Sequence, residues 1–301
     1  MLIDDIDNLL LNAGAVRYRN SMGPSSAYHP CQRKTWFDFR NVMKDNRHLA
    51  KKDDITKIGK KLRTFETGHQ YESRILDYLM RLPNVQIIKS QAEFNDDVIH
   101  GFIDAIAKID GEIYVIEIKS MGDKYFNKLK DDGCEVNNPS YYIQCQIYMH
   151  YSEIKKCILL VENKNTNEMY EESIDYVSGV AITYIELLKR LARQKEPPKM
   201  ISQDPSYYIC KMCDFFPVCH NKQPVRNSCR TCVNFEIGDG GIAMCKQYKK
   251  AITLEKQHVE QDGTKCPNYS LLPEFAVNNP AVDNFKKELE SIFNTKVTQV
   301  F

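Results

Sequence analysis

The chain has 301 residues, of which 43% are hydrophobic and 27% charged, a composition typical of a globular protein with a sizeable core in one or two domains. It contains no apolar run near the roughly 20 residues of a membrane-spanning helix, and residues 1–5 lack the basic flank and apolar core of a secretory signal. We therefore expect a cytoplasmic protein and no membrane partner. Eleven cysteines in such a chain indicate metal ligation rather than a disulfide framework.

Charge is unevenly distributed, although the formal net charge is only +1. Residues 31–63 contain eleven Lys and Arg against four Asp and Glu, a local excess of seven positive charges. A basic segment beside an acidic site can hold a polyanion such as a nucleic acid. A solvated basic face without a ligand is the alternative interpretation.

Hydrophobic periodicity predicts a series of helices and strands along the chain. Residues 64–80 have helical spacing, with His69, Glu72, Leu76 and Leu79 on one stripe. The elements expected after this helix are strands at 85–94, 98–109 and 112–119, a helix at 139–151, strands at 157–162 and 170–176, and a helix at 180–194.

This order of elements predicts an α/β fold, with a core of one helix, three strands, a helix and a strand. Regular periodicity weakens near residue 200, where cysteines begin to accumulate. The expected segments are a basic N-terminal segment at 1–63, the core at 64–200, a cysteine segment at 201–222, a second cysteine-rich module at 223–270, and a C-terminal amphipathic helix at 271–301 that carries Phe285, Leu289 and Ile292.

The hairpin at residues 101–120 carries the strongest chemical signal. Asp110 and Gly111 suit a two-residue type I′ turn, because both tolerate positive φ angles. Continued from that turn, the antiparallel register places Asp104 directly opposite Glu117. Like charges at opposed positions destabilise a sheet, so a positive group is expected between them.

Strand alternation brings a lysine to the same place. Lys119 shares a face with Glu117, while Ile116 and Ile118 point the other way into the core. Two carboxylates with a lysine can bind Mg²⁺ or Mn²⁺, which prefer oxygen ligands, and can activate a water at a phosphodiester. The alternative is a surface hairpin with scattered charges.

At this point the sequence resembles the PD-(D/E)XK nuclease superfamily, in its RecB-like branch, over residues 64–150. The matching motifs are Gly101-Phe102-Ile103-Asp104, Glu117-Ile118-Lys119, the helix with Gly68-His69 and Glu72, and Gln144 to Tyr148 as Q-x-x-x-Y. The resemblance implies a restriction-endonuclease-like core, flanked by helices, in which four motifs occur in the family's order.

The resemblance also implies a role for each matched residue. Metal ligands would be His69, Asp104, Glu117 and the main-chain carbonyl of Ile118, with Lys119 as the catalytic lysine. Glu72 would support the site, and Gln144 and Tyr148 would support it or guide a DNA strand. Two alternatives stay open at this stage: a core histidine at position 69, and plain packing for the Gln144 and Tyr148 pair.

The first cysteine set is Cys210, Cys213 and Cys219, spaced C-x2-C-x5-C, with Cys31 far upstream. One early cysteine and three late ones around a nuclease core resemble the iron-sulfur nucleases, namely the AddB-type domain and the CRISPR-associated RecB-like exonucleases. The resemblance implies a structural [4Fe-4S] cluster that closes the domain. Zinc at the same four thiolates is the alternative.

The second set is Cys229, Cys232, Cys245 and Cys266, spaced C-x2-C-x12-C-x20-C. The opening pair and the next interval favour a structural zinc site of the ribbon or treble-clef kind. His220 and His258 are further candidate ligands. Among the isolated cysteines Cys134, Cys145 and Cys157, the latter two are expected to pack as small apolar residues.

Together these features predict a metal-dependent DNA exonuclease or end-processing nuclease in repair, recombination or replication. The expected substrate is single-stranded DNA or DNA ends, and a helicase or recombination protein is a partner implied by resemblance only. Arg33, Lys34 and Arg40 would line a channel for a strand, with Trp36 and Phe37 as stacking surfaces.

Three rival functions remain. One is a DNA-binding or recombination partner with a nuclease fold of minor activity, and another is a site-specific endonuclease. The third is a zinc-dependent interaction protein. Trp36 could equally belong to the core.

Overall fold

The computed structural model describes residues 2–13, 21–42, 52–253 and 266–276. The chain divides into two compact units, and each is described by itself. The first comprises Met1–Arg17, Ser21–Tyr28 and Asn46–Arg190, and the second comprises Tyr18–Asn20, His29–Asp45 and Leu191–Phe301. No helix among the described ranges combines the length and apolar character that crossing a bilayer requires.

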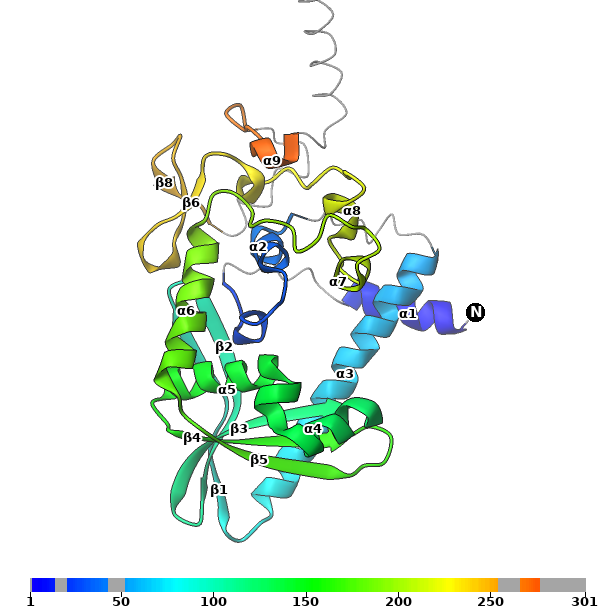
Figure 1. Cartoon of the computed structure of the whole chain (residues 1–301), viewed down its shortest axis with the longest axis vertical. Coiled ribbons are helices and arrows are strands. Elements are labelled where there is room, and N and C mark those ends of the chain that lie inside the picture. The colour runs from blue at the N-terminus through cyan, green and yellow to red at the C-terminus, as the bar shows by residue number, and fades with distance from the viewer. Residues whose placement is uncertain (1, 14–20, 43–51, 254–265, 277–301) are drawn as a thin grey trace, which may run out of the picture. The chain divides into compact units, whose positions relative to one another are not determined.

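The first unit is built on a five-stranded sheet with helices on both faces (Figure 1). Its elements in chain order are α1 (Leu2–Ala13), η1 (Pro24–Ser26), α3 (Lys52–Met80), β1 (Val85–Asp96), β2 (Ile99–Ile109), β3 (Glu112–Met121), α4 (Asp123–Asn137), α5 (Pro139–Ser152), β4 (Lys156–Asn163), β5 (Met169–Asp175) and α6 (Ser178–Arg193). The strand order is β1-β2-β3-β4-β5, and only the β3–β4 pair is parallel. This mixed α/β architecture agrees with the predicted fold class and with the predicted order of strands.

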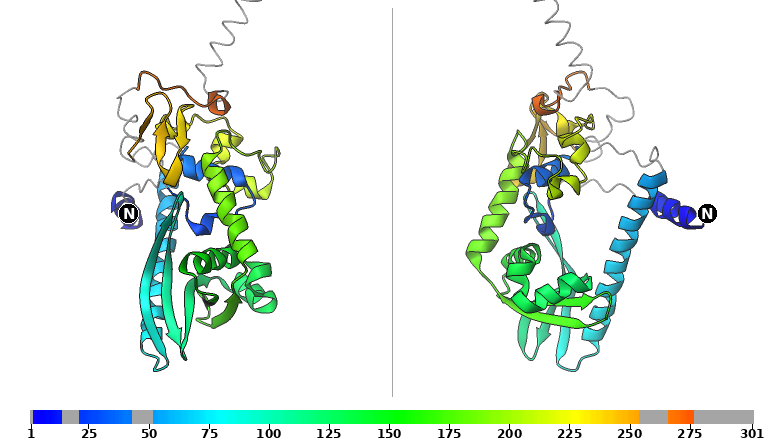
Figure 2. Two further views of the ribbon diagram at one scale, coloured as in Figure 1. Left: turned by 90° about the vertical axis from the view of Figure 1, so that its left-hand side faces the viewer. Right: turned by 45° about the vertical axis from the view of Figure 1, so that its right-hand side comes forward.

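Two hydrophobic clusters fill the two faces of this sheet. Figure 2 shows the sheet and the helices that cover it from two sides. On one face, Ile75 and Leu76 of α3 pack against Ile116 and Ile118 of β3. On the other face, α4 and α5 cover the sheet with buried side chains that include Phe126, Leu129, Cys145, Tyr148 and Met149. The central strand β3 is therefore covered on both sides, so a charged residue within it lies in the interior of the unit.

The helix that carries His69 and Glu72 is longer than its periodicity predicted, because α3 begins at Lys52 rather than near residue 64. Helix α4 was missed altogether. It contains a kink at Gly133, whose φ is +79°, and its buried residues are Phe126, Leu129 and Cys134. Phe126 and Leu129 have helical spacing, but the stripe is short and Gly133 interrupts it, and sequence reasoning overlooked it.

The second unit contains short elements around an aromatic cluster. These elements are α2 (Gln32–Arg40), α7 (Tyr208–Lys211), α8 (Phe216–Cys219), η3 (Cys229–Thr231), β6 (Phe235–Ile237), η4 (Asp239–Gly241), β7 (Ala243–Cys245), β8 (Lys250–Ala251) and α9 (Pro273–Ala276). Strands β6, β7 and β8 form a small antiparallel sheet. The cluster consists of Trp36, Phe37, Val42, Phe215, Val218, Val225, Leu272 and Phe275.

This cluster corrects the predicted stacking surfaces. Trp36 and Phe37 are completely buried and pack on Phe275, so neither ring is available to a nucleobase. The core alternative for Trp36 is therefore the right one. Arg40 is also buried, so it cannot line a channel for a strand.

Some predicted features lie outside the described residues. They are part of the basic segment at 43–51, His258, and the stretch at 277–301 with Phe285, Leu289 and Ile292.

Candidate active site

The β2–β3 hairpin has the predicted register. Its pairs run from Ile109 with Glu112 at the turn to Ala105 with Ile116, and the ladder ends there, one pair before Asp104 and Glu117. The next position, Asp104 with Glu117, is not part of the ladder. The main-chain N–H of Ile118 donates instead to Oδ2 of Asp104 at 2.8 Å. The Asp104 carboxylate thus replaces a main-chain partner where the two strands separate.

A bend in β2 accompanies this separation. Ile103 belongs to the cluster beneath α4 and α5, whereas Ala105 belongs to the cluster beneath α3. Simple alternation would place these two residues on one face. The change of face occurs at Asp104, which is half-buried, and burial raises the pKa of its carboxyl while Lys119 acts in the opposite direction.

Glu117 is a completely buried acidic residue in the central strand of the first unit. Its Oε1 pairs with Nζ of Lys119, while Oε2 has no hydrogen-bond partner within the described ranges. Burial first, and the neighbouring Asp104 second, raise the pKa of Glu117 to about 8. A carboxylate with an unused oxygen in the interior is costly unless a cation completes its environment.

Lys119 lies on the same face as Glu117, as alternation predicted. Burial alone would lower its pKa, but Glu117 and Asp104 together raise it above the usual range. Its Nζ also lies 5.4 Å from the ring centroid of Tyr141 on α5. Lys119 is therefore an ammonium ion at neutral pH, and it can stabilise negative charge but cannot act as a base.

Glu72 of α3 is held beside these residues by a contact that sequence reasoning missed. The side-chain amide of Gln91 on β1 donates to Oε1 of Glu72. Gln91 has φ +48°, and the β1–β2 ladder skips it opposite Asp104. Burial and Asp104 raise the pKa of Glu72. Gln91 could not be recognised from the sequence, because it lies among other polar residues of β1 and its positive φ is visible only in the structure.

His69 extends from the same helix towards solvent. Its side chain is 81% exposed, and Nδ1 lies 3.6 Å from Oε2 of Glu72. The histidine is therefore near the acidic residues, yet it is not in the core, so the alternative of a satisfied core histidine is excluded.

Gln144 and Tyr148 lie behind the site on α5. Both are buried, and Nε2 of Gln144 donates to the hydroxyl of Tyr148 at 2.8 Å. Burial and the neighbouring Glu117 raise the pKa of Tyr148. The two residues pack and bond with each other, next to the Glu117–Lys119 pair.

Oxygen donors therefore meet at one point of the first unit, but they are not arranged as a finished metal site. Across the described residues, no three His, Cys, Asp or Glu side chains are grouped so that they could hold a metal. Asp104 and Glu117 supply two carboxylates, and the free oxygen of Glu117 fits a hard cation.

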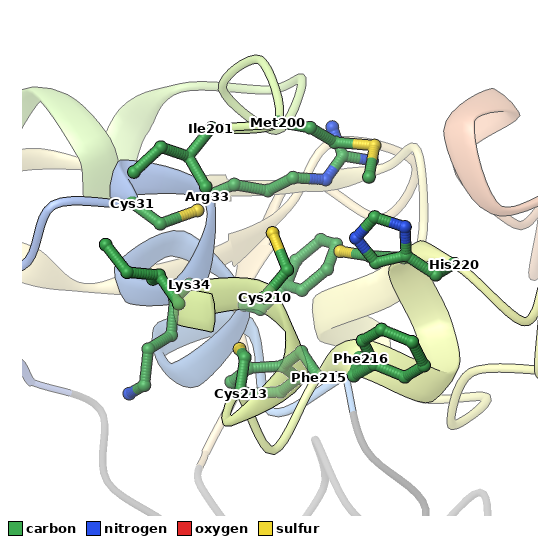
Figure 3. Close-up of a pocket in the computed structure, with 13 residues that line it drawn as sticks. Cys31, Arg33, Lys34, Met200, Ile201, Cys210, Cys213, Phe215, Phe216 and His220 are labelled. Carbon is green, nitrogen blue, oxygen red and sulfur yellow. The ribbon is translucent and has the colours of Figure 1, made fainter. Parts of the chain in front are cut away.

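The first cysteine set converges on one pocket of the second unit (Figure 3). The pocket encloses about 350 Å³, part of it open to solvent, and the cysteines that line it are Cys31, Cys210, Cys213 and Cys219. Arg33 and Lys34 also line it. All four thiols are free, and burial raises the pKa of Cys219 to about 11 while Arg33 acts in the opposite direction.

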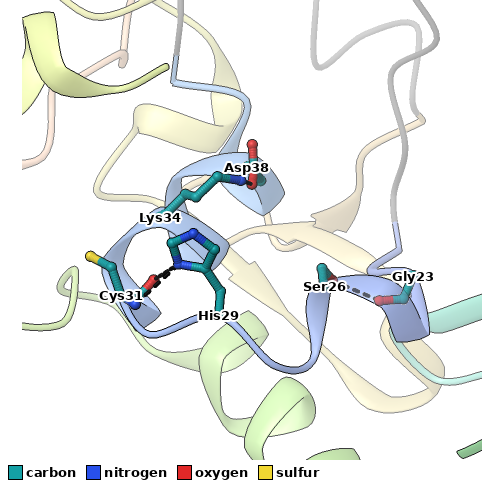
Figure 4. Close-up of polar contacts among 6 residues, drawn as sticks. All are labelled: Gly23, Ser26, His29, Cys31, Lys34 and Asp38. Carbon is teal, nitrogen blue, oxygen red and sulfur yellow. Dashed lines mark hydrogen bonds and ion pairs between the residues drawn. The ribbon is translucent and has the colours of Figure 1, made fainter. Parts of the chain in front are cut away.

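Cys31 is held at the start of α2 by its neighbour His29. The main-chain N–H of Cys31 donates to Nδ1 of His29 at 3.0 Å (Figure 4). Sequence analysis did not single out His29. Burial lowers the pKa of this histidine, which is consistent with a neutral ring that accepts a hydrogen bond.

The second set converges on another pocket, of about 290 Å³, lined by Cys229, Cys232, Cys245 and Cys266. His220 lines the first pocket instead. Among the isolated cysteines, Cys145 and Cys157 are buried in the sheet's core as predicted, and Cys134 joins them.

No protein-family model matches the sequence, and no curated protein matches it. Solved structures do show likeness. The crystal structure of SSO0001 has 20% identity and a TM-score of 0.45, covering 73% of this chain and 96% of its own. The alkaline exonuclease LHK-Exo from Laribacter hongkongensis has 11% identity and a TM-score of 0.39, over 61% of this chain and 90% of its own.

LHK-Exo in complex with dAMP gives 10% identity and a TM-score of 0.37, over 57% of this chain and 86% of its own. All these TM-scores are below 0.5, and likeness at that level is too weak to identify the function of this chain.

Proposed function

We propose that the protein is a metal-dependent DNA nuclease whose active site is centred on Asp104, Glu117 and Lys119. The observation that carries this proposal is the completely buried Glu117, which has one oxygen paired with Lys119 and the other without a hydrogen-bond partner in the part of the chain that the structure describes. Burial and Asp104 raise its pKa to about 8, and a buried acidic group with one cationic partner adds little to the stability of a core, because a buried ion pair is seldom worth its desolvation. A cation-binding site has a direct use for such a group.

In this proposal Asp104, Glu117, the carbonyl of Ile118 and His69 hold one or more Mg²⁺ or Mn²⁺ ions. Such an ion polarises a phosphoryl oxygen and lowers the pKa of a bound water. Main-chain N–H and C=O groups of one strand residue face the same way. Since the N–H of Ile118 faces Asp104, its carbonyl faces the same opening between the strands.

The chain's own residues then have separate roles. Lys119, held as an ammonium ion, stabilises the negative charge that develops on the phosphate. Glu72 and Gln91 fix the α3 side of the site. Gln144 and Tyr148 act as positioning residues that support α5 behind Glu117, because both are buried and bonded to each other.

A [4Fe-4S] cluster on Cys31, Cys210, Cys213 and Cys219 is the second part of the proposal. The pocket fits such a group because its four sulfur donors are soft ligands and none of the described residues that line it is a carboxylate. When bound, the cluster ties α2 to the segment around α7 and α8. Its role is structural, and hydrolysis requires no electron from it.

The substrate in this proposal is single-stranded DNA or a DNA end, and the process is repair, recombination or replication, where a helicase would supply the strand. The test is cleavage of end-labelled and of circular DNA, single- and double-stranded, with Mg²⁺ or Mn²⁺, using anaerobically purified wild-type protein and Lys119→Ala. Lys108→Ala is the matched control, because Lys108 is an exposed lysine of the same hairpin.

We expect the Lys119→Ala variant to lose at least about 10²-fold in rate, since it removes a group that stabilises transition-state charge. Lys108→Ala should keep the wild-type rate. Cleavage of circular substrates would favour the endonuclease alternative. Binding of DNA without metal-dependent cleavage by the wild type would overturn the proposal and favour a binding partner with a nuclease fold.

A further inference from the structure

The small sheet of the second unit is too short to be stable by itself. Strands β6, β7 and β8 contain three, three and two residues. A sheet of this size needs additional packing or a cross-link. Its buried apolar side chains are few, namely Phe235, Ile237 and Ala243.

Three separate segments meet around one pocket beside this sheet. Cys229 and Cys232 come from a tight turn in which the N–H of Cys232 donates to the carbonyl of Cys229 at 3.0 Å. Cys245 ends β7 and pairs with Phe235. Cys266 precedes a segment that returns to the turn, where Cys232 forms a bridge with Leu271.

The return segment is fixed to the turn by main-chain hydrogen bonds on both sides of that bridge. The N–H of Val233 donates to Ser270, and the N–H of Leu272 donates to Thr231, both at 2.9 Å. The N–H of Tyr269 also donates to the carbonyl of Cys266, at 3.0 Å. The backbone thus brings four cysteines from three segments of the chain to one place.

The lining of this pocket is suited to a thiolate-bound metal. Besides the cysteines it is lined by Asn234, Phe235, Gln247, Tyr248, Ile252, Asn268 and Tyr269, and none of the described residues that line it is charged. The hydroxyl of Tyr248 lies 3.8 Å from Sγ of Cys266 and accepts a hydrogen bond from Asn268 at 2.9 Å. Hydroxyl and amide groups of this kind orient metal ligands from behind.

We propose that Cys229, Cys232, Cys245 and Cys266 bind one structural Zn²⁺ that holds the sheet of β6, β7 and β8 to the return segment. Four thiolates in a closed tetrahedral set are typical of structural zinc. A C-x2-C pair in one turn, with single ligands from two other segments, is a pattern found in structural zinc sites.

The four thiols line one pocket, but among the described residues they are not grouped closely enough to form a metal site. In this proposal zinc draws the four sulfurs together as the region folds, as structural zinc commonly does.

The zinc turn, residues 229–232, is also hydrogen-bonded to helix α2 of the second unit. Arg230 lies between Cys229 and Cys232, is completely buried, and donates to the carbonyl of Phe39 on α2. Arg40 donates back to the carbonyl of Arg230 at 3.0 Å. Helix α2 begins beside Cys31, so the zinc turn holds the helix that leads from the first cysteine pocket.

The test uses the full chain, purified anaerobically, and does not depend on nuclease activity. Zinc and iron are counted per chain by mass spectrometry for the wild type, for Cys245→Ser and for Cys213→Ser. We expect one zinc in the wild type and in Cys213→Ser, and none in Cys245→Ser. Cobalt substituted into the wild type should show the absorption bands of tetrahedral four-thiolate Co²⁺.

A second measurement needs no variant, in case Cys245→Ser fails to fold. Wild-type protein is alkylated before and after zinc is removed by a chelator such as EDTA, and its peptides are mapped. The four cysteines of the second pocket should be protected until release. Zinc equal in all three proteins, iron instead of zinc at these residues, or unprotected or disulfide-bonded thiols would each overturn the proposal. None of these results would bear on the nuclease proposal.

Discussion

Each unit of this protein contains completely buried ionisable side chains, and their surroundings differ between the two units. In the sheet unit, Glu117 pairs with one lysine, and its Oε2 has no hydrogen-bond partner among the described residues. In the cysteine-rich unit, Arg40 and Arg230 donate to main-chain carbonyls and stack on aromatic rings such as Trp36 and Phe235, 4.8–4.9 Å from the ring centroids for Arg40. Burial lowers the pKa of Arg40 to about 10 and that of Arg230 to about 9, which leaves both charged at neutral pH.

This difference distinguishes a proposed functional group from structural charges. The arginines donate to main-chain carbonyls and lie on ring faces that belong to the fold, so they stabilise the packing around α2, although Nε of Arg40 has no hydrogen-bond partner among the described residues. Glu117 lies beside Asp104, which raises its pKa, and its Oε2 has no hydrogen-bond partner in the described ranges. In the proposed function, a bound cation would complete its environment.

Glu117→Gln is the variant with the largest expected effect, because it removes the ionisable carboxyl group and nearly keeps the shape of the side chain. We expect nuclease activity to fall by at least about 10²–10³-fold, since a metal ligand and its charge are lost. In the absence of metal, the free energy of unfolding of the Glu117→Gln variant should not be lower than that of the wild type. A carboxyl whose pKa is raised to about 8 in the folded state stabilises the fold only while it is protonated, and this contribution is lost as pH rises through that value.

The melting temperature of the metal-free glutamine variant should therefore equal that of the wild type near pH 5 and exceed it above pH 8. Glu171→Gln is the control, because Glu171 is an exposed residue of β5 in the same sheet. A variant that is active, or one that is much less stable than the wild type at every pH, would show that Glu117 is a structural residue.

Arg40→Met tests the other side of the comparison. The methionine leaves the carbonyl of Arg230 without its donor and removes the stacking on Trp36 and Phe235. We expect the free energy of unfolding to fall by about 2 kcal/mol, the usual cost of an unsatisfied buried acceptor with lost packing. The nuclease rate at 25 °C should stay within about twofold, because Arg40 has no role in the chemistry.

Urea unfolding of the wild type, of Arg40→Met and of Lys34→Met measures this effect. Lys34 is the control because its pair with Asp38, at 2.5 Å, is partly exposed and should contribute less than about 1 kcal/mol. Equal stability of Arg40→Met and the wild type would mean that the buried arginine is not a structural charge.

The positions of the side chains on the β2–β3 hairpin were predictable, because they depend only on local geometry. The Asp110-Gly111 turn fixes the register, and alternation then places Glu117 and Lys119 together on β3. The end of the ladder at Ala105 was not predictable, since it depends on the bend of β2 and on the irregular Gln91 of the neighbouring strand.

The cysteine-rich unit illustrates the opposite case. Cysteine spacing grouped the late cysteines into the two sets that share pockets, and the family resemblance added Cys31 to the first set. Cysteine spacing could not predict the surroundings. Trp36, Phe37 and Arg40 were assigned to a DNA channel on composition, whereas residues far along the chain, such as Phe215 and Phe275, enclose the two rings. A basic and aromatic segment looks the same in sequence whether it faces DNA or a core.

His69→Ala is expected to have the smallest effect, and it decides whether the metal site extends beyond the two buried carboxylates. The side chain is 81% exposed, so the free energy of unfolding should change by less than about 0.5 kcal/mol. If the imidazole is a ligand, the Mn²⁺ concentration for half-maximal activity should rise by about tenfold, the lower end of the cost of weakening a metal site.

Two titrations with Mn²⁺ test this, one that follows the cleavage rate and one that follows metal binding by calorimetry. If the variant only binds metal more weakly, its maximal rate at saturating Mn²⁺ should equal that of the wild type, whereas a general loss of activity would lower that rate. His100→Ala is the control, since His100 lies on β2 and pairs with Glu93 at 2.8 Å. Identical metal dependence of His69→Ala and the wild type would exclude His69 as a ligand. The buried carboxylates, with the main-chain carbonyl of Ile118, would then be the protein's only contribution to the metal in the proposed site.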